Sequence, residues 1–295
     1  MTDARQKAAS LACWSGPVEP EALGGGITNT NFTVEDAGRR YVVRIGDDIP
    51  EHQIVRSNEL AASRAAAAAG ISPSVVHAEP GAMVLEFVDG ATLGEADIRD
   101  AGRLERLLPI IKRCHRDIPL HLQGPATLFW VFHVLRNYRR TLEVGDSPHL
   151  PRLPDLNRIA EKLETAVGPI DLAFGHNDLL AANFIDDGSR IWLIDWDYAG
   201  FNSPLFDLGG LASNNGFDEA LETALLEAYF ERRADDELRH RFEAMKCASL
   251  LRETMWSMVS EIHSTIVFDY AAYTAENLDR FGDAYGRYRL RWETT

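Results

Sequence analysis

Polar residues in the second half of the chain have the types and spacing that phosphoryl transfer requires. His176, Asp178 and Asn183 form the pattern H-x-D-x-x-x-x-N, and Asp195 follows twelve residues later at the end of an apolar run, I-W-L-I-D. Transfer from ATP needs a carboxylate that accepts the proton of the attacking hydroxyl, and oxygen ligands that hold Mg²⁺ on the phosphates. An Asp, an Asn five residues on and a second Asp on a neighbouring strand supply these groups. A hairpin between them should bring Asn183 and Asp195 together.

A polar loop followed by a strand with a solvated Asp is the alternative interpretation. The pattern H-x-D-x-x-x-x-N alone would arise by chance in on the order of one to a few per cent of chains of this size. An apolar strand that ends in Asp195 lowers those odds further. The combination therefore favours phosphoryl transfer.

A glycine cluster near the N-terminus could contact the phosphates of a nucleotide. Residues 24–29 read G-G-G-I-T-N and lie in an expected strand–turn–strand. The cluster is neither the G-x-G-x-x-G of a Rossmann unit nor a Walker loop. A glycine-rich β-turn can place backbone N–H groups over phosphates, as kinases do. We therefore expect Gly26, Thr28 and Asn29 to contact a nucleotide.

Such a loop needs a cation for the α and β phosphates and a carboxylate that holds the cation. The strand Y-V-V-R-I places Arg44, rather than lysine, in the expected position. Glu59, on a helix expected over about 51–69, is the candidate partner. A solvated helix charge is the alternative interpretation of Glu59.

The elements expected around these residues form two parts. Short strands over about 21–46, the helix over 51–69 and a hairpin at S-V-V-H-A and A-M-V-L-E-F-V come first. Helical periodicity then runs to about residue 166, strands return over 171–198, and helices dominate over 217–291. This order predicts an α+β fold with an N-terminal lobe over 1–88 and a larger, mostly helical lobe over 89–295.

Three segments together resemble the choline/ethanolamine kinase branch of the aminoglycoside-phosphotransferase-like kinases. They are G-G-I-T-N-T-N-F, H-N-D-L-L-A-A-N-F and I-D-W-D-Y-A-G-F-N, and the resemblance extends from about residue 20 to 290. It implies a protein-kinase-like two-lobe fold and ATP- and Mg²⁺-dependent phosphorylation of a small amino alcohol such as choline or ethanolamine. Arginine in place of the usual kinase lysine also occurs in choline kinases. The hinge strand M-V-L-E-F-V-D should present backbone groups of Glu86 and Val88 to adenine.

The resemblance assigns roles to the residues of the catalytic segment. Asp178 corresponds to the catalytic base, and Asn183 and Asp195 correspond to the magnesium ligands. His176 is expected to shape the catalytic loop. Asp207, in S-P-L-F-D-L, resembles the buried Asp that braces this loop through its backbone.

The resemblance also implies an aromatic pocket for a cationic head group, which cation–π contacts would recognise. Tyr198, Trp256 and Tyr273 are its expected members. Two positions depart from the choline kinase pattern, because Glu253 stands where a second Trp often occurs and Asn214 where an acidic residue often occurs. These departures concern the acceptor and not the ATP or magnesium chemistry.

Other functions remain as alternatives at this point. One is phosphorylation of an aminoglycoside, homoserine or sugar by the same fold, although the C-terminal aromatic residues argue mildly against an aminoglycoside. Another is a nucleotide-binding pseudokinase, which would typically lack the base or a metal ligand. Asp178, Asn183 and Asp195 are all present.

Composition narrows the choice of partner and compartment. The 295 residues carry a formal net charge of −15, which argues against nucleic-acid binding. No run approaches 18 uninterrupted apolar residues, so membrane insertion is not expected. Three scattered cysteines and an N-terminus without an apolar signal segment favour the cytoplasm. The sequence leaves the oligomeric state open, with a homodimer as one candidate.

Overall fold

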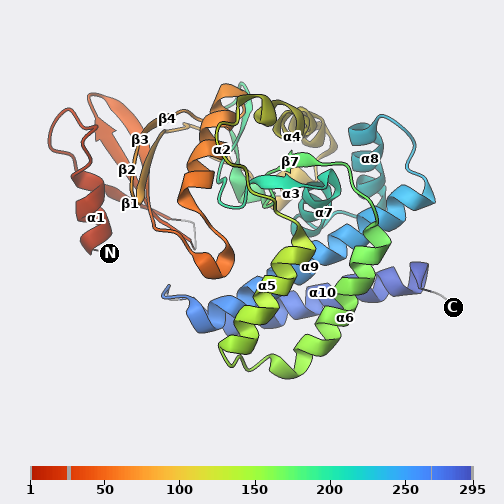
Figure 1. Ribbon diagram of the computed structural model, residues 1–295. Helices are drawn as coiled ribbons and strands as arrows, with labels where there is room; N and C mark the ends of the chain where they lie inside the picture. The colour runs from red at the N-terminus through yellow and green to blue at the C-terminus, as the bar shows by residue number, and fades with distance from the viewer. Residues whose placement is uncertain (1, 25–27, 267, 294–295) are drawn as a thin grey trace.

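An antiparallel sheet forms the N-terminal end of the molecule. The computed structural model describes residues 2–24, 28–266 and 268–293. The strand order is β1-β2-β3-β5-β4. Figure 1 shows this sheet next to α1, at the N-terminal end of the molecule. The strands are β1 (Glu21–Leu23), β2 (Thr30–Asp36), β3 (Arg39–Ile45), β4 (Val75–Glu79) and β5 (Ala82–Glu86). Alternating residues such as Phe32, Val34 and Val43 form a small core with α1 (Thr2–Ala9) on one face.

The helix α2 (Arg56–Ala68) joins this sheet to the rest of the molecule. It begins later than expected because η1 (Pro50–His52) is a short 3-10 turn that is followed by Gln53 at φ 60°. Its alanines pack into the core of the larger lobe. The Asn58 amide donates to the Ala199 carbonyl at 2.8 Å and accepts from the Thr127 hydroxyl at 2.8 Å. This helix therefore packs as part of both lobes.

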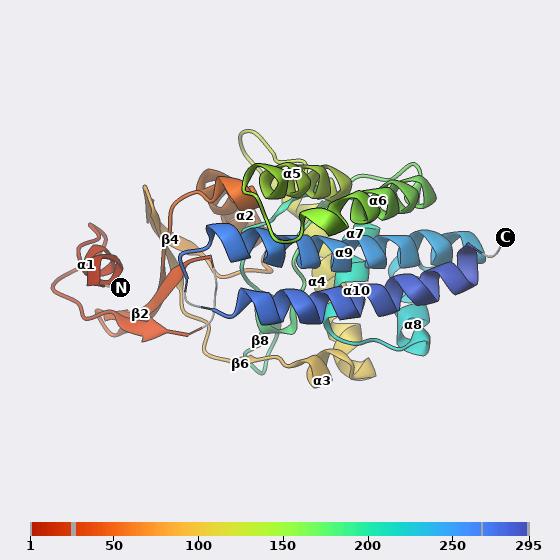
Figure 2. The same cartoon turned by 90° about the horizontal axis from the view of Figure 1, so that it is seen from below.

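Helices make up most of the larger lobe, and α9 is its central element. In Figure 2, α10 runs beside α9 on one side and α5 and α6 lie on the other. Nearly every described residue of α9 from 244 to 260 is buried, which is typical of a helix surrounded by neighbours. The helices are α3 (Glu95–Ile98), α4 (Ala101–His121), α5 (Val131–Val144), α6 (Leu153–Val167), α7 (Pro204–Asn214), α8 (Glu219–Phe230), α9 (Asp236–His263) and α10 (Tyr270–Trp292), with η2 (Leu150–Arg152) before α6.

Short strands between α6 and α7 position the catalytic segment. The strands β7 (Ala173–Gly175) and β10 (Gly200–Asn202) pair with each other, and β6 (Ala91–Thr92), β8 (Phe184–Asp186) and β9 (Ile191–Leu193) form a second small sheet. The loop that leaves β7 reaches β8 through η3 (Ala181–Asn183). The α+β fold is confirmed. The lobe boundary near residues 88 and 89 stays a prediction, because α2 shares the larger core.

The helices that the structure describes differ in length or hydropathy from membrane-spanning helices. Within the described residues, none is long and apolar enough to cross a bilayer.

Candidate active site

A buried carboxylate holds the start of the loop that carries Asp178. Asp207, in the first turn of α7, accepts hydrogen bonds from the backbone N–H groups of His176 at 2.8 Å and Asn177 at 2.7 Å. His115 Nε2 lies 2.9 Å from the same carboxylate. Burial opposes ionisation of Asp207, but the hydrogen bond and charge of His115 outweigh burial and hold its pKa below the usual value. This is the bracing contact that the resemblance implied.

His176 links this loop to the neighbouring strand end. Its ring is fully buried, and Nε2 lies 2.9 Å from the carbonyl oxygen of Ile194. Burial lowers its pKa, which favours the neutral ring that donates to this carbonyl. His176 therefore positions the loop and does not face the reacting groups.

The hairpin places Asn183 beside the segment that carries Asp195. The Ile194 N–H donates to the Asn183 carbonyl at 3.0 Å, and the Asn183 amide donates to the Asp178 carbonyl at 2.8 Å. Asp195 adopts φ 72°, and its side chain is a quarter exposed. The three predicted residues thus lie in one region, as the spacing suggested.

The oxygen donors of this region suit Mg²⁺ bound together with phosphates. Asn183 offers an amide oxygen, and Asp195 and Asp197 offer carboxylates. Within the described residues, no three acidic, histidine or cysteine side chains group closely enough to enclose a metal alone. Mg²⁺ typically takes one or two carboxylates and completes its shell with substrate phosphates and water. The residues present therefore fit this ion.

Asp178 has the ionisation behaviour expected of a base that works near neutral pH. Burial raises its pKa to about 7, Arg252 lowers it, and the negative charges of Glu253, Asp195 and Asp197 raise it further. Its side chain keeps 20% of its surface exposed. A general base is most effective when its pKa lies near the working pH.

Arg44 binds three carboxylates from both lobes. Its Nε lies 2.9 Å from Glu59 Oε1, and its Nη2 lies 2.8 Å from Asp195 Oδ1 and 2.9 Å from Asp197 Oδ1. The expected partner Glu59 is therefore in place. Burial raises the pKa of Glu59 to about 7, and its two arginine partners oppose this rise.

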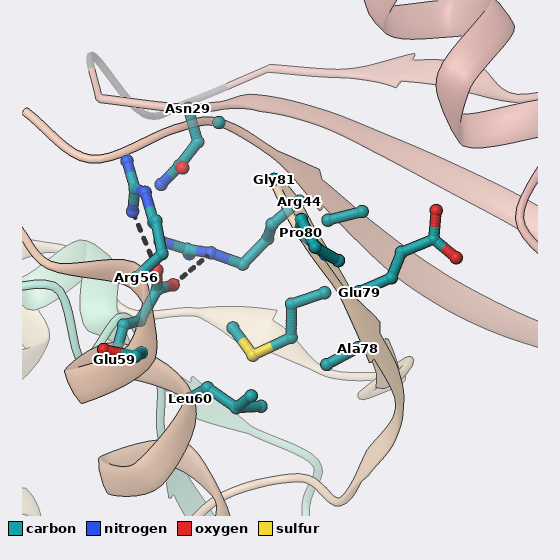
Figure 3. A pocket seen from close by; sticks show the side chains of 13 residues that line it. Asn29, Arg44, Arg56, Glu59, Leu60, Ala78, Glu79, Pro80 and Gly81 are labelled. Carbon is teal, nitrogen blue, oxygen red and sulfur yellow. Dashed lines mark hydrogen bonds and ion pairs between the residues drawn. The ribbon is translucent and has the colours of Figure 1, made fainter.

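Two members of this cluster were not predicted from the sequence. Arg56 Nη1 lies 2.7 Å from Glu59 Oε2 and 2.8 Å from Asp197 Oδ1, and Figure 3 shows Arg56 and Arg44 on either side of Glu59. Asp197 also accepts from the Thr28 hydroxyl at 2.7 Å. The local signals were the i,i+3 spacing of Arg56 and Glu59 on one helix, and the second acid in I-D-W-D.

Two cavities border the predicted nucleotide residues. One of about 300 Å³ lies between the sheet and α2, with Asn29 and Arg44 among its lining residues, as Figure 3 shows. The other has a volume of about 380 Å³. Glu86 and Val88, at and just after the end of β5, line it together with Trp192 of β9. Gly26 lies outside the described residues.

The expected aromatic wall is packed more tightly than an open cage. Trp256 is 3% exposed, and its indole N–H donates to the Tyr198 hydroxyl at 2.8 Å. His52 stacks on Trp256 with ring centroids 4.8 Å apart and an interplanar angle of 27°. Burial, together with the charge of Arg252, lowers the pKa of His52 to about 3, so this ring is neutral. One indole face is therefore occupied by a side chain of the protein.

Charged and polar side chains surround Asp178 on the acceptor side. Arg252 Nη1 lies 2.9 Å from Glu253 Oε2 and 3.8 Å from Asp178 Oδ1. Tyr273 donates its hydroxyl to Glu253 Oε1 at 2.8 Å. Asp178, Arg252, Glu253 and Asn214 line one small cavity. Arg252 is a functional candidate that sequence reasoning missed, because a single Arg in a helix carries no motif.

Comparisons with known proteins agree with this geometry. The family profile described as choline/ethanolamine kinase matches residues 21–282. Ethanolamine kinase 2 of Mus musculus is 27% identical and covers 87% of this chain and 73% of its own length. Protein LicA of Haemophilus influenzae is 25% identical, with 84% of this chain and 75% of its own length covered.

Solved structures extend the comparison to the fold. A choline/ethanolamine kinase family protein from Mesorhizobium loti superposes with a TM-score of 0.77 at 30% identity, over 96% of this chain and 94% of its own. A spectinomycin phosphotransferase shares the fold at 12% identity, with a TM-score of 0.63 over 95% of this chain and 98% of its own. With a family profile that spans most of its length, and a site built as phosphoryl transfer requires, this chain belongs to the choline/ethanolamine kinase family and is a kinase.

Proposed function

We propose that this protein transfers the γ-phosphoryl group of ATP to the hydroxyl of a small amino alcohol. The observation that carries the proposal is the position of Asp178, with Asn183 and Asp195 on one side and Glu253 and Arg252 on the other. A base with a pKa near 7 thus lies beside the proposed metal ligands and lines a small polar cavity of about 10 Å³. The similarity to ethanolamine kinase 2 of Mus musculus supports the same acceptor class.

The nucleotide would lie along the N-terminal lobe. We assign adenine contacts to Glu86 and Val88, whose cavity has suitable dimensions, and phosphate contacts to Gly26, Thr28, Asn29 and Arg44. Glu59 holds the Arg44 guanidinium in place. Asn183 and Asp195, with Asp197 beside them, would hold Mg²⁺, which supplies positive charge to the phosphates when bound.

The transfer itself needs one proton acceptor and correct alignment. Asp178 accepts the hydroxyl proton as the acceptor oxygen forms its bond to the γ-phosphorus. The bond from phosphorus to the bridging oxygen of ADP breaks, and ADP keeps the electron pair. Asp207 and His176 contribute by fixing the loop that aims Asp178.

The acceptor side suits an ammonium group that carries N–H donors. Asp178 and Glu253 are two acids beside one cation, Arg252, so the region carries an excess negative charge when Asp178 is ionised. The Glu253 carboxylate can accept a hydrogen bond from a primary ammonium, whereas a quaternary ammonium has no N–H to donate. Because His52 already covers one face of Trp256, cation–π binding there is restricted. We therefore favour an ethanolamine-type head group over choline, with Tyr198, Trp256, Tyr273 and Asn214 as the surrounding residues.

We also propose that the protein works in the cytoplasm. The three cysteines, Cys13, Cys114 and Cys247, are free thiols in the structure. Free thiols are typical of proteins in reducing compartments.

A coupled assay of ADP release tests the acceptor assignment. The purified protein is assayed with ethanolamine, choline, homoserine, an aminoglycoside and a neutral alcohol, with Asp178→Asn as the matched control. We expect ethanolamine to give the highest kcat/KM and the control to give little turnover. Homoserine, the aminoglycoside or the neutral alcohol as the best acceptor would refute the proposal.

A further inference from the structure

Arg252 is a buried cation beside the base. It lies in the middle of α9, within the stretch of that helix that neighbours surround, and only 4% of its surface is exposed. Its Nη1 is the atom that lies 3.8 Å from Asp178 and 2.9 Å from Glu253. Buried arginines are costly unless their donors are satisfied, so this position requires an explanation.

The partners of Arg252 in the structure do not satisfy its guanidinium. The Nε and Nη2 atoms are buried and make no well-aligned hydrogen bond among the described residues, and the buried Tyr138 hydroxyl is the polar group that interacts with this side of Arg252. The Tyr198 ring lies against the group, with its centroid 4.2 Å from Cζ, but a ring face is no substitute for an acceptor oxygen. Arg252 also lines the cavity that contains Asp178. A ligand with anionic oxygens would satisfy a donor set of this kind.

The loop that carries the base has no cation of its own. Residues 178–183 read D-L-L-A-A-N, without lysine or arginine. Arg44 and Arg56 are already bound to carboxylates of Glu59 and Asp197. Among the described residues, the ion pairs of Asp178 involve Arg252 alone. Arg252, on α9, is therefore the side-chain cation that the described structure places beside Asp178.

We propose that Arg252 is a further catalytic residue, which binds the oxygens of the phosphoryl group while it moves from ATP to the acceptor. This proposal rests on the phosphoryl transfer proposed above. The acceptor oxygen bonds to phosphorus, the bond to the ADP oxygen breaks with its electron pair on ADP, and the hydroxyl proton passes to Asp178. The three remaining oxygens carry negative charge throughout, and a planar guanidinium can bind two of them at once. Glu253 holds the guanidinium in position before the phosphoryl group arrives.

The test measures the affinity of a mimic of the transferring group as well as the rate. ADP with aluminium fluoride imitates the planar phosphoryl group, and ADP alone is the reference ligand. Both dissociation constants are measured without acceptor for the wild type, Arg252→Gln and Arg252→Lys. Arg239→Gln serves as a matched control, because Arg239 lies on the same helix but bonds Thr223 of α8. Circular dichroism checks that each variant is folded.

We expect Arg252→Gln to weaken binding of ADP with aluminium fluoride at least tenfold, with ADP alone changed less than about twofold. Its kcat should fall by about 10³-fold, at the lower end of losses known for catalytic arginines. Arg252→Lys, which keeps the buried charge and is the variant more certain to fold, should lie between. Unchanged affinity for the mimic in either folded variant would overturn the proposal, as would a loss confined to the KM of the acceptor.

The two proposals can fail separately. Binding of the mimic needs no acceptor, so the role of Arg252 is tested even if no amino alcohol is a substrate. Conversely, an Arg252→Gln variant that phosphorylates ethanolamine at the normal rate would leave the proposed function standing and remove Arg252 from it.

Discussion

The two sides of Asp178 are built in different ways. On the nucleotide side, Arg44 and Arg56 bind Glu59, Asp195 and Asp197, so two cations and three carboxylates from β3, α2 and the segment after β9 form one ion-pair network. On the acceptor side, one helix supplies an adjacent arginine and glutamate, and buried donors of that arginine remain unsatisfied in the described structure. The side chains of the nucleotide side are thus held by ion pairs before a nucleotide binds. On the acceptor side, Arg252 keeps donors that could bind a ligand.

The largest expected effect concerns the residue that both sides share. Asp178→Asn should lower kcat by about 10²–10⁴-fold, because the amide cannot accept the hydroxyl proton. ATP binding should stay unchanged, since the ion pairs of Arg44 do not include Asp178. Steady-state kinetics and a nucleotide-binding titration check both parts. Near-normal turnover would exclude Asp178 as the base.

The pH profile tests the same carboxylate without a mutation. Burial raises the pKa of Asp178 to about 7, and only the ionised form can accept a proton. The rate should therefore increase about tenfold per pH unit up to this pKa and level off above it. The free energy of unfolding should change with pH in the opposite direction. Between the ordinary pKa of an aspartate and about 7, Asp178 is protonated in the folded state and ionised in the unfolded state. The contribution of Asp178 to the stability of the fold therefore decreases as the pH rises through this range. A flat rate profile from pH 5 to 8 would contradict the assignment.

The metal region of the nucleotide side can be tested by titrating magnesium. Asp195→Asn should raise the Mg²⁺ concentration for half-maximal rate by at least about tenfold, the loss seen even for residues that only support metal ligands. Asn183→Ala should have a smaller effect, because a carboxylate binds a hard cation better than an amide does. An unchanged requirement in both variants would remove these residues from the metal site.

Substitution of Arg44 tests how much its ion pairs stabilise the fold, with Arg40 on the same strand as the control. Arg44→Lys should lower the free energy of unfolding by about 1–2 kcal/mol, because one ammonium cannot replace a guanidinium that contacts three carboxylates, two of them buried. Arg40→Lys should change it by less than about 1 kcal/mol, since Arg40 pairs with Asp89 at the exposed surface. Urea denaturation measures both. Equal effects would mean that the Arg44 cluster contributes no more than a surface pair.

The smallest effect is expected on the acceptor side, where one contact among several is lost. Glu253→Gln should raise the KM for ethanolamine by about three- to tenfold with little change in kcat, because the amide accepts a hydrogen bond but carries no charge. The KM for a neutral alcohol of similar size should stay the same. Equal changes for both acceptors would show that Glu253 acts through Arg252 or the fold rather than on the ammonium group.

Sequence reasoning predicted correctly those contacts that depend on local spacing. The fold class, the meeting of Asn183 with the Asp195 segment and the Arg44–Glu59 pair follow from a hairpin, a motif and neighbouring elements. Arg252 could not be found in this way, because it comes 74 residues after Asp178 and reaches it only through the packing of α9. The burial of Trp256 was equally inaccessible, since it depends on His52, which precedes α2.

The contacts of His52 and Asn58 also determine how the molecule responds to heat. His52 stacks on α9 and bonds Ser260 at 3.0 Å, and Asn58 bonds the backbone at Ala199. Both residues belong to the first 88 residues, yet their partners lie in the helical lobe. Separating the lobes would expose the alanine face of α2 and leave these polar groups without partners, so neither lobe can melt alone at low cost. We therefore expect the chain to unfold as one calorimetric unit, and substrate bound in either half to protect the whole molecule.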